Sequence, residues 1–110
     1  METREFLVQG SAPEPYKVTF RKVGGNLSAY CTCPAGENGM YCKHRFSILE
    51  GSIKGIVSGN EADVEIIASW LAGTDVEVAM KVVKDLEKEE ERIKKQLSAA
   101  KKALARMMLN

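Results

Sequence analysis

Hydrophobic side chains in the first half of the chain recur with the period of β-strands. Apolar residues occupy alternate positions of two segments, 16–23 and 27–33, as expected for strands with one buried face. The two residues between them, Gly24 and Gly25, are a typical two-residue hairpin turn. The pattern therefore predicts a β-hairpin.

The register of this hairpin follows from its turn. If the two glycines form the loop, Val18 lies opposite Cys31, and the apolar sides of both strands share one face. Only Lys22 with Leu27, the second pair from the turn, mixes a charged and an apolar side chain. The agreement of the two faces supports the hairpin.

Two more short elements are predicted in this half. Phe6-Leu7-Val8 is a candidate strand, and Pro13 and Pro15 break the chain after it. Residues 42–50 are predicted to form a short helix, which Gly51 ends. The pattern does not place the N-terminal strand relative to the hairpin.

After residue 60 the pattern changes to that of helices, and proline is absent. Asn60 is predicted to cap a helix of about residues 61–72, with Asp63 at its third position. Gly73 is predicted to end this helix. Its apolar stripe consists of Val64, Ile67, Trp70 and Leu71.

A second, much longer helix is predicted over about residues 75–108. Thr74 and Glu77 form a capping box at its start. Its apolar residues repeat in heptads, and the position farthest from the seam always holds lysine. The seam consists of Val76, Val83, Glu90, Leu97 and Leu104 at one position and Ala79, Leu86, Ile93, Ala100 and Met107 at the other. This contrast predicts a coiled-coil-like helix.

These elements predict an α+β protein with two parts. Residues 1–59 hold a small β-hairpin and a short helix (ββα), and residues 60–110 form a helical part that contains the long helix. With 45% hydrophobic and 28% charged residues in 110, the composition is that of a folded protein. The formal charge of +1 predicts neither a strong nucleic-acid binder nor an acidic scaffold.

The N-terminus lacks the pattern of a signal peptide, and no apolar stretch approaches the ~18 residues that cross a bilayer. We therefore expect a cytoplasmic protein with reduced cysteines and without a membrane partner.

All three cysteines and the single histidine lie in one segment, CTCPAGENGMYCKH, residues 31–44. Cys31 and Cys33 are two apart in a strand, so both point to one face. We expect Cys42 just before the short helix and His44 in its first turn, where they reach the same ion. Thiolate and imidazole ligands predict Zn²⁺, and four protein ligands leave no place for a catalytic water. The site is therefore expected to be structural, and neither a catalytic residue nor a small-molecule substrate is predicted.

Other interpretations of the cysteines remain open. They could be ordinary thiols, or Cys31 and Cys33 could form a redox pair with Cys42 as the resolving thiol. The histidine and the spacing disfavour iron. The odd number of cysteines and the concentration of four ligands in 14 residues favour zinc.

The spacing C-x-C-x8-C-x-H resembles the SWIM zinc finger, in which C-x-C is followed by a variable gap and C-x-H. The hairpin before it, Pro34 after Cys33, and Cys42-Lys43-His44 at a helix start agree with this resemblance. SWIM domains occur in Swi/Snf-type helicases, Mutator-type transposases, ubiquitin ligases and partners of recombinases. The resemblance, over about residues 16–50, implies a ββα zinc module that binds DNA or proteins.

The polar face of the hairpin and the region around the metal are candidate contact surfaces. Basic and aromatic side chains there could follow a phosphate backbone or contact a protein, or could simply be solvated. They are Lys17, Arg21, Tyr30, Lys43 and Arg45.

The long seam needs a partner, because a helix of this length spans ~50 Å. We expect a second copy, in parallel or antiparallel orientation. The seam could also bind a different helical protein, or fold back on the helix that holds Trp70. Function is predicted as that of a non-enzymatic zinc-binding adaptor that self-associates, with a small dimeric DNA-binding protein as the alternative.

Overall fold

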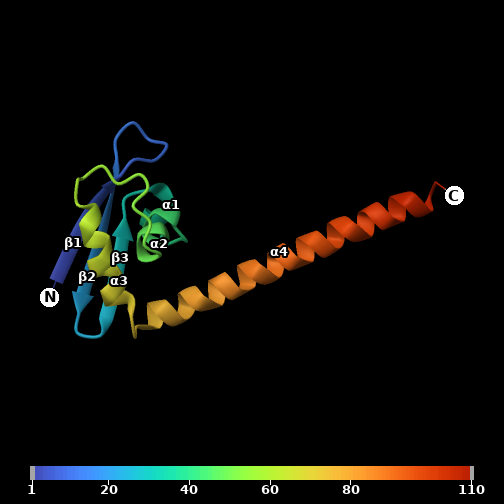
Figure 1. Cartoon of the computed structure of the whole chain (residues 1–110). Helices are drawn as coiled ribbons and strands as arrows, with labels where there is room; N and C mark the ends of the chain where they lie inside the picture. Colours follow the sequence, from blue (N-terminus) through green and yellow to red (C-terminus); the bar gives the residue numbers. More distant parts are fainter. Residues whose placement is uncertain (1, 110) are drawn as a thin grey trace. The chain divides into compact units, whose positions relative to one another are not determined.

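The computed structural model, which describes residues 2–109, confirms the α+β fold. Three strands form an antiparallel sheet in the order of the sequence: β1 (Glu2–Val8), β2 (Tyr16–Val23) and β3 (Asn26–Cys31). Figure 1 shows them side by side. The helices are α1 (Pro34–Glu37), α2 (Lys43–Leu49), α3 (Val64–Leu71) and α4 (Asp75–Met107), with a 3₁₀ turn, η1 (Glu61–Asp63), before α3.

The predicted hairpin register is confirmed, and the structure explains its mismatched pair. Val18 lies opposite Cys31, and Lys22 lies opposite Leu27. Leu27 is buried, whereas the Nζ of Lys22 donates a hydrogen bond of 2.9 Å to the carbonyl oxygen of Trp70. The lysine therefore reaches the C-terminal end of α3 and satisfies a carbonyl that the helix leaves without an internal partner.

The core lies on one face of the sheet. The side chains of Phe6, Val18 and Phe20 are fully buried there, and the rings of Phe6 and Phe20 meet edge to face at 5.9 Å. Helix α2 packs against β3 and α3, and Ile67 of α3 is also fully buried. This packing puts α3 in the same compact unit as the sheet.

The outer edge of β1 is covered by residues 55–58, which the sequence pattern did not reveal. Val8 forms an antiparallel bridge with Ile56. The backbone N–H of Val57 donates to the carbonyl of Leu7 at 2.8 Å. The pairing satisfies polar groups that would otherwise be exposed on an edge strand.

The predicted cap at Asn60 is wrong. Asn60 precedes η1 rather than an α-helix, and its side chain makes no capping bond. Its amide instead donates to the carbonyl of Glu5 at 2.8 Å and to the carboxylate of Asp63 at 3.3 Å. Asn60 therefore ties the chain to β1, and α3 begins only at Val64.

The capping box of α4 is confirmed, except that the Glu77 carboxylate bonds to the N–H of Gly73 instead of that of Thr74. The N–H of Glu77 donates to the hydroxyl of Thr74 at 3.3 Å, and the carboxylate of Glu77 accepts from the N–H of Gly73 at 3.1 Å.

The chain forms two compact units, Met1–Glu77 and Val78–Asn110. The first unit extends beyond the predicted boundary at residue 59, because it includes α3.

Truncating Phe20 to alanine should destabilise the first unit by about 3–5 kcal/mol, because it leaves a cavity at a fully buried position. Trp70, the single tryptophan, is buried in this unit, so its fluorescence in a denaturant titration reports the change. The exposed Val23 is the control, and Val23→Ala should change stability by less than about 0.5 kcal/mol. Equal effects would contradict this description of the core.

Candidate metal centre

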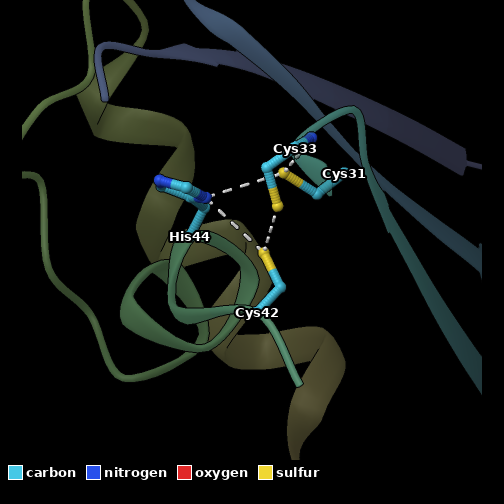
Figure 2. A group of neighbouring side chains, drawn as sticks. All are labelled: Cys31, Cys33, Cys42 and His44. Carbon is cyan, nitrogen blue, oxygen red and sulfur yellow. Dashed lines mark hydrogen bonds between the residues drawn. The ribbon is translucent and has the colours of Figure 1, made fainter. Parts of the chain in front are cut away.

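The four predicted ligands come from three consecutive elements. Cys31 is the last residue of β3, Cys33 precedes α1, Cys42 precedes α2, and His44 lies in the first turn of α2. Figure 2 shows their side chains pointing toward one another. The three cysteines are buried and the histidine is partly buried. The structure therefore confirms the expected places of Cys42 and His44.

The distances between the ligand atoms are compatible with a metal site that has four protein ligands. All four atoms lie within 4.8 Å of one another. The Sγ atoms of Cys33 and Cys42 are 3.3 Å apart, and the Nδ1 of His44 lies 3.6 Å from the Sγ of Cys42 and 3.9 Å from that of Cys31. Zinc–ligand bonds of about 2.0–2.3 Å in a tetrahedron give edges of about 3.6–3.8 Å. The residues therefore fit Zn²⁺, and all three cysteines are free of disulfides.

Backbone N–H groups point at the sulfur atoms. The N–H of Cys33 donates to the Sγ of Cys31 at 3.5 Å, and that of Gly36 donates to the Sγ of Cys33 at 3.3 Å. Burial alone raises the pKa of Cys42, but the backbone N–H of Arg45 and the neighbouring ligand side chains lower it to about 6. Burial raises the pKa of Cys31, which ionises readily only when a metal replaces its proton.

The imidazole of His44 is held by packing. Its Nδ1 faces the sulfur atoms, which leaves Nε2 on the opposite side of the ring. The ring of Tyr16 lies against it, with 5.0 Å between centroids. A Cβ atom on Gly10 would lie 2.6 Å from the Tyr16 ring and 3.2 Å from Nε2. The absence of a side chain at Gly10 therefore permits this packing.

Helix α1 is absent from the elements that the sequence pattern predicts. Pro34 at its first position and Glu37 in its first turn are typical of a helix start and could have revealed it. The helix brings Gly36 against the first ligand, where an added Cβ would lie 2.6 Å from the carbonyl oxygen of Cys31. Only glycine fits there without displacing Cys31.

Arg45 is engaged inside the module. Its guanidinium donates to the carbonyl of Ala29 at 3.2 Å and to that of Met40 at 2.6 Å. It thereby links α2 to β3 and to the loop that carries Cys42. This predicted contact residue also has a structural role beside the metal.

The other predicted contact residues fall into two places. Lys17, Arg21 and Tyr30 share the outer face of the sheet, where the Arg21 guanidinium lies 6.0 Å from the Tyr30 ring. Lys17 forms an ion pair with Glu5 at 3.5 Å. Lys43 lies on α2 and lines a cavity of about 450 Å³ beside the metal ligands. The structure does not combine all five into one surface.

Residues 6–49 match the family model of the SWIM zinc finger. They extend from β1 to the end of α2 and include all four ligands. This segment is therefore similar to the SWIM zinc finger, and we refer to it by that name. The similarity indicates a zinc-binding module, and its ligand set agrees with the geometry above. No curated protein and no solved structure shows significant similarity to the chain.

Among the described residues, no helix has the length and apolarity that spanning a membrane requires.

Removing zinc with a chelator should unfold the SWIM zinc finger. Zinc binding contributes about 10–16 kcal/mol in zinc-finger peptides, which is as large as the whole stability of a typical domain. The fluorescence of Trp70 should shift to that of an exposed indole, and adding Zn²⁺ should restore it. Unchanged fluorescence after complete metal removal would show that zinc does not hold this unit together.

Replacing Gly36 with alanine should weaken zinc binding, because the new methyl group displaces Cys31. We expect an affinity loss of about tenfold or more, as for changes next to metal ligands. The control is Gly25→Ala, since a Cβ atom at Gly25 meets no other atom within 4 Å. Competition with a chromogenic chelator measures both variants. Equal affinities would contradict a close contact at Gly36.

Proposed function

We propose that this chain is a non-enzymatic, zinc-dependent interaction protein that acts as a homodimer. The SWIM zinc finger forms its folded binding module, and α4 joins two copies. The use of three reduced cysteines as ligands suits a reducing compartment such as the cytoplasm.

The closed ligand set supports a non-enzymatic role for the metal. Catalytic zinc sites usually keep one position open for water or substrate, whereas structural sites use four protein ligands. The four ligand atoms of Cys31, Cys33, Cys42 and His44 lie within 4.8 Å of one another, close enough to bind one ion together. Zinc in this arrangement stabilises the module and leaves recognition to the surrounding surface.

The main observation for self-association is the exposed apolar stripe of α4. The side chains of Leu86, Ile93 and Leu97 are 57%, 55% and 52% exposed. They repeat at heptad spacing on one side of the helix, with lysines on the other side. A contiguous apolar stripe of this length is typical of a protein interface, and an identical helix offers a stripe of the same length and period.

The DNA-binding alternative has less support from the charges. On the outer face of the sheet, Lys17 pairs with Glu5. On α2, the Arg45 guanidinium is occupied by two carbonyl oxygens. Of the four cations among the predicted contact residues, Arg21 and Lys43 remain to contact phosphates, and the chain as a whole has a formal charge of only +1.

Placing a charge in the stripe should dissociate the dimer. We expect the zinc-loaded wild-type protein to sediment as a dimer, and Ile93→Asp to raise its dissociation constant at least about tenfold, because the carboxylate is buried in the apolar seam. Ser98→Asp adds the same charge to the same helix outside the seam and should leave the dimer intact. A wild-type protein that is monomeric at all concentrations in sedimentation equilibrium would refute self-association.

A further inference from the structure

The charges of α4 are divided into two blocks. Residues 85–91 hold five acidic side chains and one lysine. Residues 92–109 hold six basic side chains and no acidic one. All charged side chains in both blocks are exposed, so they are available to a partner helix. The boundary between the blocks lies near the middle of α4.

We propose that two copies of this chain pair through α4 in the antiparallel orientation. This inference rests on the homodimer proposed above and names the geometry of its interface. Antiparallel pairing around the boundary between residues 91 and 92 places Leu86 opposite Leu97 and Val83 opposite Ala100, so the apolar seams stay in register. In the same register, residues 85–91 of each copy face residues 92–98 of the other.

The register therefore brings each acidic block against a basic block. A parallel pair would place acid beside acid and base beside base over the same length. Like charges held side by side destabilise an interface, whereas complementary charges select the partner and its orientation. The helix dipoles also favour the antiparallel arrangement, since the positive end of each helix lies beside the negative end of the other.

Glu90 is the one charged residue of the seam, and it favours the same orientation. In a parallel pair it would meet Glu90 of the second copy inside the seam. In the antiparallel pair it lies opposite Ile93. Its carboxylate can then keep its ion pair with Lys94 of the same helix, in which Oε1 and Nζ are 3.3 Å apart. The cost of this charge is therefore smaller in the antiparallel pair.

The flanks of the seam distinguish the two orientations residue by residue. Glu87 and Lys94 lie on the same flank, seven residues apart, and Glu89 lies on the other. In the antiparallel pair Glu87 faces Lys94 of the second copy, twice by symmetry, and Glu89 faces the neutral Gln96. In a parallel pair Glu89 faces Lys94, and Glu87 faces the apolar Val82.

The antiparallel pair has a consequence for function. Each copy of α4 begins at Asp75, and its first residues, up to Glu77, belong to the unit that holds the SWIM zinc finger. Val76 of one copy lies opposite Met107 of the other, so the two helix starts are separated by about 45 Å along the pair. The two zinc fingers are therefore joined to opposite ends of the helix pair, which suits a protein that binds two partner molecules.

Three charge reversals test this orientation in the full-length, zinc-loaded protein. Glu87→Lys should raise the dimer dissociation constant by about tenfold, because two cross-helix ion pairs become repulsive. Glu89→Lys changes the net charge equally and should alter the constant by less than about threefold. Mixing Glu87→Lys with Lys94→Glu should form a heterodimer with both ion pairs restored. Sedimentation equilibrium at low salt measures the dissociation constants of the wild type, of Glu87→Lys, of Glu89→Lys and of the mixture.

The outcomes separate this inference from the homodimer itself. A dimer that is weakened by Glu87→Lys but not by Glu89→Lys, and that forms again when Glu87→Lys is mixed with Lys94→Glu, supports the antiparallel pair. Sensitivity to Glu89→Lys, or equal sensitivity to both reversals, would overturn the orientation but leave the dimer standing. A wild-type protein that stays monomeric would overturn both the orientation and the homodimer.

Discussion

The close grouping of the ligand atoms of Cys31, Cys33, Cys42 and His44 is the constraint on which the first unit depends. It joins the end of β3 to the start of α2 across a loop that otherwise contains only a four-residue helix. Other features support this one junction: the absence of a side chain at Gly36 lets the loop approach the strand, and backbone N–H groups stabilise the thiolates. A sheet of three strands buries little apolar surface, so its core alone contributes little stability. A bound metal then helps to hold the helices against the sheet.

The same constraint explains why polar residues near the site are engaged. Arg45 donates to carbonyl groups on both sides of the junction, and Lys22 reaches the end of α3. Both residues would be read from sequence as surface cations. In the structure their hydrogen bonds hold α2 and α3 to the sheet and to the loop before α2.

Much of the fold and of the site could be predicted because short-range rules decide it. The glycine turn fixed the pairing of Val18 with Cys31, and ligand spacing fixed the places of Cys42 and His44. Long-range contacts could not be predicted. No local pattern shows that residues 55–58 would cover β1, or that the Asn60 amide would bond to Glu5 rather than cap a helix. Such contacts depend on segments that are distant in the sequence and meet only after folding.

The stability of the first unit thus depends on a closed zinc site of three sulfur atoms and one nitrogen atom. X-ray absorption at the zinc edge of the purified protein tests that claim directly. It should show three sulfur neighbours at about 2.3 Å and one nitrogen neighbour at about 2.0–2.1 Å. A spectrum with fewer than three sulfur atoms, or with a water oxygen in the first coordination sphere, would contradict it.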